Sequence, residues 1–188
     1  MTSTRYIALL RGINVGRAKR VAMADLRKLV ADLGYGDVRS VLNSGNLVFS
    51  ADGIAADAAA AAIEEQLVLK LGLAARVTVL SRDDLAAVLA ENTLLPVAED
   101  HSRLLVFTLA DGAARAQVAP LCERDWGDEA LAVGQRAAYV WCPEGMLGSA
   151  AATALGKHLG DNTTSRNWNT LCKLYALCSE AGSVPPGA

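Results

Sequence analysis

The order of short apolar runs and helical patterns constrains the fold of this chain more than any other feature. In the first half, the pattern predicts a strand at 6–10, a helix at 26–33, strands at 38–42 and 47–49, a helix at 54–71 and a strand at 76–80. The two middle strands are joined by Asn43-Ser44-Gly45-Asn46, whose composition is typical of a hairpin turn. This order is that of a split β-α-β, or ferredoxin-like, unit.

The second half repeats the same plan until its last element. The pattern predicts a strand at 103–109, a helix at 113–123, strands at 130–133 and 137–142 and a helix at 150–159. A second helix then begins near Arg166, where the first half has a strand. Pro120 falls near the end of its helix, where it disfavours helical continuation. We therefore expect an α+β protein made of two ferredoxin-like halves, each with an antiparallel sheet.

Domain limits follow from this order and from one break in it. Residues 1–92 form the first half together with a further helix that starts near Ser81. Residues 93–101 contain Pro96 and are predicted to be the linker. Residues 102–181 form the second half, which ends in the long helix, and residues 182–188 are predicted to be a disordered tail.

Composition excludes several classes of function. The chain has 188 residues and a net charge of −2, so no global basic field attracts nucleic acid or an anionic membrane. The N-terminus lacks the apolar core of a signal peptide, and no apolar run is long enough to cross a bilayer, so we expect a cytoplasmic protein. The four cysteines form no Cys-x-x-Cys pair and the two histidines lie far apart in sequence, so no metal, cofactor or disulfide is expected.

The segment from Thr163 to Leu174 is rich in side chains that can bind a ligand. If it is wound as a helix from Arg166, then Trp168 falls on the apolar side, and Arg166, Asn169 and Lys173 fall on the polar side. A helix N-terminus with an arginine, an amide and a lysine is a plausible anion site. The alternative, a polar face that is merely solvated, is the commoner situation.

Two glycine-containing loops are expected to meet at one rim of the first sheet. The first and third strands of a ferredoxin-like unit are antiparallel neighbours, so the loop Arg11–Asn14 should face the turn Ser44–Asn46. Together with the nearby cations, these loops form a candidate anion site, although neither matches a known phosphate-binding motif. The predicted ligand-binding residues are Arg11, Asn14, Lys19, Arg20, Ser44, Asn46, Arg166, Asn169 and Lys173.

Three motifs in this order resemble a known family. They are the run from Tyr6 to Gly16, the run Asn43–Phe49 that follows the helix opened by Met23, and the run Arg166–Thr170. The chain resembles the domain of unknown function 1697 family over roughly residues 4–180. The resemblance implies two ferredoxin-like halves in a bacterial cytosolic protein, and it implies no activity and no catalytic residue.

The chain departs from the family pattern in two places. Family members often carry a second glycine where Arg17 stands, and Ser-Lys where Ser149-Ala150 stands. The missing lysine removes a cation beside the Arg166 segment, so this chain does not support a reading in which that lysine is essential.

Three functions remain open at this point. The first is binding of a small phosphate- or carboxylate-bearing molecule, by an enzyme or by a binding protein, although no nucleophile–base pair is visible. The second is nucleic-acid binding, which is not favoured because Phe49 alone is no stacking platform. The third is a non-catalytic interaction module anchored by Trp126, Trp141 or Trp168, although core packing is favoured for Trp168.

Overall fold

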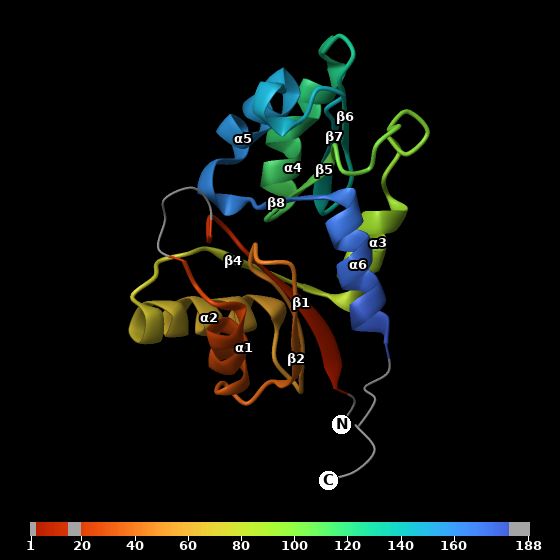
Figure 1. The fold of residues 1–188 in the computed structure, drawn as a ribbon. Helices are drawn as coiled ribbons and strands as arrows, with labels where there is room; N and C mark the ends of the chain where they lie inside the picture. The colour runs from red at the N-terminus through yellow and green to blue at the C-terminus, as the bar shows by residue number, and fades with distance from the viewer. Residues whose placement is uncertain (1–2, 15–19, 181–188) are drawn as a thin grey trace. The chain divides into compact units, whose positions relative to one another are not determined.

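A computed structural model describes residues 3–14 and 20–180 of the chain. The chain divides into two compact units, which we call unit 1 (Met1–Asp83 with Lys173–Ala188) and unit 2 (Asp84–Cys172). Each unit holds one four-stranded antiparallel sheet with helices interleaved between its strands (Figure 1). The predicted α+β fold with two antiparallel, ferredoxin-like halves is thus confirmed.

Unit 1 has the strand order β2-β3-β1-β4, which is the order of a ferredoxin-like sheet. Its elements are β1 (Thr4–Leu10), α1 (Met23–Ala31), β2 (Gly36–Val41), β3 (Asn46–Ala51), α2 (Ala56–Leu71) and β4 (Val77–Ser81). The central strand β1 pairs with β3 on one side and with β4 on the other, and both pairings are antiparallel. The end of β1 therefore lies beside the start of β3, with Leu9 opposite Asn46.

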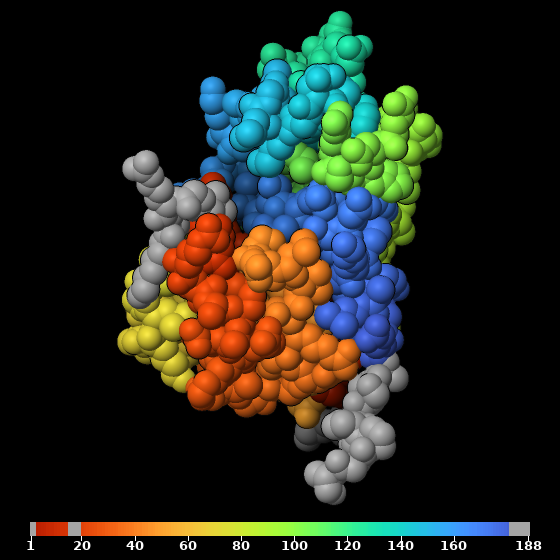
Figure 2. All heavy atoms as spheres, in the orientation of Figure 1, coloured from red at the N-terminus to blue at the C-terminus, as the bar shows by residue number. Residues whose placement is uncertain are grey.

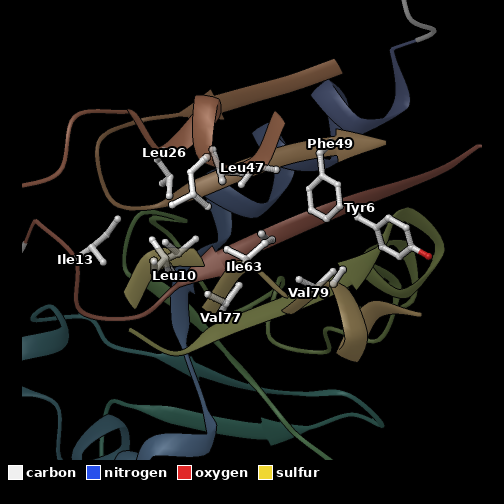
Figure 3. Close-up of a cluster of buried hydrophobic side chains, with 14 of the residues drawn as sticks. Tyr6, Leu10, Ile13, Leu26, Leu47, Phe49, Ile63, Val77 and Val79 are labelled. Carbon is white, nitrogen blue, oxygen red and sulfur yellow. The ribbon is translucent and has the colours of Figure 1, made fainter. Parts of the chain in front are cut away.

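The core of unit 1 lies between its sheet and the helices α1 and α2. Alternate β1 residues, Tyr6, Ala8 and Leu10, point into it, as the period of two in a strand requires. Leu26 of α1 and Ile63 of α2 are fully buried against them (Figure 3). Helical spacing on α2, with Ala59, Ile63 and Leu67 buried, gives that helix one apolar face.

Unit 2 has the strand order β6-β7-β5-β8, which matches that of unit 1 strand for strand. Its strands are β5 (Leu104–Thr108), β6 (Ala130–Val133), β7 (Ala137–Trp141) and β8 (Ser165–Asn167), and its interleaved helices are α4 (Gly112–Val118) and α5 (Ala150–Leu159). The remaining α-helices are α3 (Arg82–Ala90) and α6 (Trp168–Ser179). The boundaries between the two units fall within these two helices. Short 3-10 helices lie at Ala119–Glu123, Met146–Gly148 and Gly160–Asn162.

The core of unit 2 is built in the same way as that of unit 1. Leu105 and Phe107 of β5 and Val140 of β7 pack against Val118 of α4 and Leu155 of α5. The helix predicted over residues 113–123 becomes a short 3-10 helix from Ala119, because proline at position 120 cannot continue the α-helical hydrogen-bond pattern.

One element of unit 2 differs from the sequence expectation. Residues 165–167 form a strand, β8, that pairs with β5 and completes the fourth strand of the second sheet. The expectation that the second half ends in a helix without this strand was therefore wrong. The helix α6 starts two residues later than predicted, and its first turn is capped by Asn167, whose Oδ1 accepts from the backbone N of Thr170 at 2.9 Å.

Within the described ranges 3–14 and 20–180, no helix is both long enough and apolar enough to cross a bilayer. The predicted tail at residues 182–188 lies outside these ranges.

Candidate functional site

The loop after β1 and the turn before β3 are in direct contact. Asn14 Nδ2 donates to the carbonyl oxygen of Asn43 at 2.8 Å, and the backbone N of Leu10 donates to the carbonyl oxygen of Gly45 at 2.8 Å. A Cβ at Gly45 would lie 2.7 Å from Ile13 Cδ1, so only glycine fits there. The prediction that the two loops meet at one rim of the sheet is confirmed.

Asn14 also forms two hydrogen bonds with Val21. Its Oδ1 accepts from the backbone N of Val21 at 2.7 Å, and its Nδ2 donates to the carbonyl oxygen of Val21 at 3.0 Å. The two hydrogens of the amide are therefore both used, one on Val21 and one on Asn43. Asn14 acts as the clamp that holds residues 14, 21 and 43 together.

The two other polar residues of the turn hold its shape. Asn46 is fully buried at the start of β3, and its Nδ2 donates to the carbonyl oxygen of Val41 at 3.0 Å and to Ser44 Oγ at 2.9 Å. Ser44 itself is exposed. These bonds make Asn46 a support of the turn, and direct contact of Ser44 or Asn46 with a ligand stays a prediction.

Several residues in and beside these loops have left-handed backbone conformations. Positive φ angles occur at Gly12 (70°), Asn14 (56°), Leu42 (60°) and Gly45 (78°). Leucine is a costly residue in the left-handed region, and Leu42 is also largely exposed. Strained backbone persists where the surrounding structure determines it, and it is common at ligand-binding loops.

The predicted cations of the rim differ in solvent exposure. Arg11 is half-buried and Arg20 is exposed. On the same face of unit 1, α1 lies beside the β2–β3 hairpin (Figure 2). Lys19 lies outside the described residues.

Arg166 is not on a polar helix face, and this expectation was wrong. It sits in the middle of β8 opposite Val106, where its Nη1 donates to Thr164 Oγ1 at 3.0 Å and to the carbonyl oxygen of Ser165 at 2.8 Å. Burial lowers the pKa of this guanidinium to about 10, because its charged form is poorly solvated there. Asn169 and Lys173 are exposed on α6, as predicted from its helical spacing.

The predicted residues fall into both units. Arg166 and Asn169 belong to unit 2, and the remaining described ones belong to unit 1.

The aromatic residues of unit 1 form part of its core. Phe49 stacks between Tyr6 and Tyr35 with ring centroids 5.5 Å and 4.9 Å apart. The other face of β1 is buried too, since Ile7 and Leu9 are at most 1% exposed. The sheet of unit 1 therefore presents no exposed aromatic platform of the kind that stacks RNA bases.

The tryptophans also differ from one another. Trp141 and Trp168 are buried, which confirms core packing for Trp168, and Trp126 is half-buried. Trp126 lines a groove of about 480 Å³ in unit 2 together with Arg124, Lys157 and His158. No sequence pattern groups these four residues, because about 30 positions separate Arg124 and Trp126 from Lys157 and His158.

No cluster of three or more histidine, cysteine, aspartate or glutamate side chains that could hold a metal occurs among residues 3–14 and 20–180. The four cysteine thiols are free, and Cys142 and Cys178 are buried.

Comparisons with known proteins identify a family and a similar fold. The family model described as "Protein of unknown function (DUF1697)" matches residues 3–139, which is more than half of the chain. Among curated proteins, none matches. Among solved structures, the chain is similar to the conserved bacterial protein SP0830 from Streptococcus pneumoniae, with 27% sequence identity and a TM-score of 0.75. That similarity covers 94% of this chain and 99% of the other.

Proposed function

The chain belongs to the family of proteins of unknown function DUF1697, and we propose that it binds a small phosphate- or carboxylate-bearing molecule through the segment from Arg11 to Arg20. One observation carries this proposal: the segment concentrates positive charge, and Asn14 anchors it. Its ten residues include four cations and no acid, in a chain whose net charge is −2. The four cations are Arg11, Arg17, Lys19 and Arg20.

The hydrogen bonds of Asn14 hold this cationic segment to the rest of unit 1. By bonding to Val21 on one side and to Asn43 on the other, Asn14 ties the end of the cationic segment to the hairpin turn. Anchored loops lose less conformational entropy on binding than loose ones do, so the clamp favours affinity. In this proposal, Arg11, Lys19 and Arg20 neutralise the anion, while Asn14, Ser44 and Asn46 keep the loops in place.

Arg166, Asn169 and Lys173 are proposed as further anion-binding residues. A guanidinium whose charge is destabilised by burial is stabilised by a bound anion, which would raise the lowered pKa of Arg166 again. A cytoplasmic, bacterial setting and a role without a metal or cofactor are part of the same proposal.

A thermal-shift panel tests the proposal on the full chain. The panel contains inorganic phosphate, pyrophosphate, ribose 5-phosphate, citrate and a short single-stranded oligonucleotide. Binding to the folded state raises the melting temperature, and we expect at least one of the small anions to do so. The double variant Arg11→Gln/Arg20→Gln should lose most of this response.

The matched control is Lys28→Gln, which removes an exposed cation of α1 in the same unit, away from the clamped loop. It should respond as the unchanged protein does. A response to the oligonucleotide alone, with a steep dependence on salt, would replace the proposal with nucleic-acid binding. If a small anion still raises the melting temperature of the double variant, the segment from Arg11 to Arg20 is not the anion site.

A further inference from the structure

Unit 2 carries a groove that is lined by none of the residues of the proposed anion site. The groove, of about 480 Å³, runs along α5, and its size falls within the range of small-molecule sites. Trp126, Arg124 and Leu147 contribute to it from the segments before α5, and Thr153, Lys157 and His158 contribute from α5 itself. The groove therefore combines an indole, an aliphatic side chain, a hydroxyl and three basic side chains.

Charge in this region is separated by sign. Among the described residues that line the groove, none is a carboxylate, and Arg124 and Lys157 take part in no ion pair with any described residue. A neighbouring hollow of about 210 Å³ shares Trp126 and Ser149 with the groove and is lined by Asp128, Glu129 and Glu144. An anion is therefore attracted to the groove and repelled from the hollow beside it.

The N-terminus of α5, beside the groove, is bound by the carboxylate of Glu129. Glu129 accepts from Ser149 Oγ at 2.6 Å and from the backbone N of Ala150 and of Ala151 at 3.0 Å each. Hence the first turn of α5 is satisfied by this carboxylate. Any anion that enters the groove depends on the basic side chains, not on the helix N-terminus.

Trp126 is held in place and keeps part of its surface exposed. Its Nε1 donates to the carbonyl oxygen of Leu121 at 2.8 Å, which fixes the plane of the indole. The Arg124 guanidinium carbon lies 4.4 Å from the centre of the ring. Leu147 is fully exposed, so an apolar ligand group lying in the groove would remove its surface from water.

Two side chains near the C-terminal end of α5, Lys157 and His158, are suited to contact a phosphate. His158 Nδ1 lies 2.8 Å from the carbonyl oxygen of Ala154, and this carbonyl can only accept, so Nδ1 carries a hydrogen and Nε2 is left for a ligand. In the imidazolium form Nε2 also carries a hydrogen and donates to a phosphate oxygen, whereas in the neutral ring it accepts from a protonated phosphate oxygen. Lys157 is exposed one residue earlier in the same turn. Cations in the last turn of a helix are also favoured by its dipole, so the test has to separate that role from binding.

We propose that this groove binds a small molecule in which a planar aromatic ring is joined to a phosphate, with Trp126 and Leu147 contacting the ring and Arg124, Lys157 and His158 contacting the phosphate. The aromatic ring of such a molecule stacks on the indole, and its phosphate lies between the basic side chains. This ligand therefore contacts both the apolar and the basic parts of the lining. Neither inorganic phosphate nor an uncharged aromatic molecule would use both.

The test follows the indole ¹H–¹⁵N signals of the full chain by NMR. Trp126→Phe assigns the Trp126 signal among the three, and adenosine monophosphate, phenyl phosphate, ribose 5-phosphate and adenosine are the probes. We expect the first two to shift the Trp126 signal saturably, and adenosine monophosphate to bind about tenfold more tightly than ribose 5-phosphate because of ring stacking.

Charge variants on exposed side chains complete the test without disturbing the core. Arg124→Gln and Lys157→Gln should each weaken the binding of adenosine monophosphate about fivefold. The matched control is Arg136→Gln, which removes an exposed cation of unit 2 that pairs with Asp84 outside the groove, and it should leave the affinity unchanged.

Three results would overturn the inference: no saturable shift with either aromatic phosphate, equal binding of ribose 5-phosphate and adenosine monophosphate, or equal weakening by Arg136→Gln. The result is independent of the proposed rim site, because Arg11→Gln/Arg20→Gln should leave the shift of the Trp126 signal intact.

Discussion

Replacement of Gly45 by alanine tests the contact between the two rim loops directly. Gly45 has a φ of 78°, in the left-handed region, and an added Cβ would lie 2.7 Å from Ile13 Cδ1 and 2.8 Å from Leu10 Cβ. Gly12, in the facing loop, has a similar φ of 70°, but no described atom comes within 4 Å of the Cβ position, chain neighbours excluded. Gly12→Ala is therefore a matched control that shares the backbone cost without the clash.

The expected magnitudes follow from these two terms. An L-residue in the left-handed region costs about 1–2 kcal/mol, which is the whole expected effect of Gly12→Ala. Overpacking against Ile13 and Leu10 adds about 1–3 kcal/mol, so Gly45→Ala should lower the free energy of unfolding by about 2–5 kcal/mol.

The assay is urea denaturation followed by far-UV circular dichroism. Tryptophan fluorescence does not report unit 1, because Trp126, Trp141 and Trp168 all lie in unit 2. Hydrogen exchange of the Leu10 amide, which donates to the carbonyl oxygen of Gly45, gives a local reading of the same contact. If Gly45→Ala and Gly12→Ala destabilise equally, the loop and the turn are not packed as described.

Three further predictions concern other parts of the molecule. Burial alone would raise the pKa of Asp37, but hydrogen bonds from Arg5 and Arg39 outweigh it and hold this pKa below 3.8. The stabilisation from Asp37 is thus present above its unfolded pKa and is lost as the pH falls through the folded value, so Asp37→Asn should flatten the loss of stability below about pH 4 in melting curves. Glu129→Ala removes the acceptor for Ser149 and two backbone N–H groups, and should destabilise unit 2 by about 1–3 kcal/mol in urea denaturation followed by tryptophan fluorescence. Burial raises the pKa of all four thiols, so alkylation at neutral pH, measured by mass spectrometry, should be slow in the folded protein and fast in urea. These thiols are Cys122, Cys142, Cys172 and Cys178.

The strands that consist of apolar runs could be predicted, whereas β8 could not. The run from Tyr6 to Leu10 is apolar because β1 is buried on both faces, so its pattern carries the information. Ser165, Arg166 and Asn167 are polar, and three residues are too few for a period to show. They form a strand because tertiary contacts fix them beside β5, where Thr164 and Thr108 exchange backbone and side-chain hydrogen bonds.

The rim was predictable and the groove was not, for the same kind of reason. A topological rule places the end of β1 beside the start of β3, so the contact between Asn14 and Asn43 follows once the strands are recognised. No such rule joins Trp126 to Lys157, because their proximity depends on how α4 and its following turns pack against α5. The role of Asn14 as a clamp could not be predicted from the sequence either. Only the geometry shows that its amide hydrogens are bonded within the chain.

A backbone ¹H–¹⁵N NMR titration of the full chain with pyrophosphate tests the central claim most directly. If the clamped cationic segment binds the anion, the amide signals of Gly12, Val21 and residues 43–46 should shift saturably, and Arg11→Gln/Arg20→Gln should abolish these shifts while the Lys28→Gln control keeps them. Saturable shifts confined to other parts of the chain, or an unchanged titration in the double variant, would contradict the claim that this segment is the anion site.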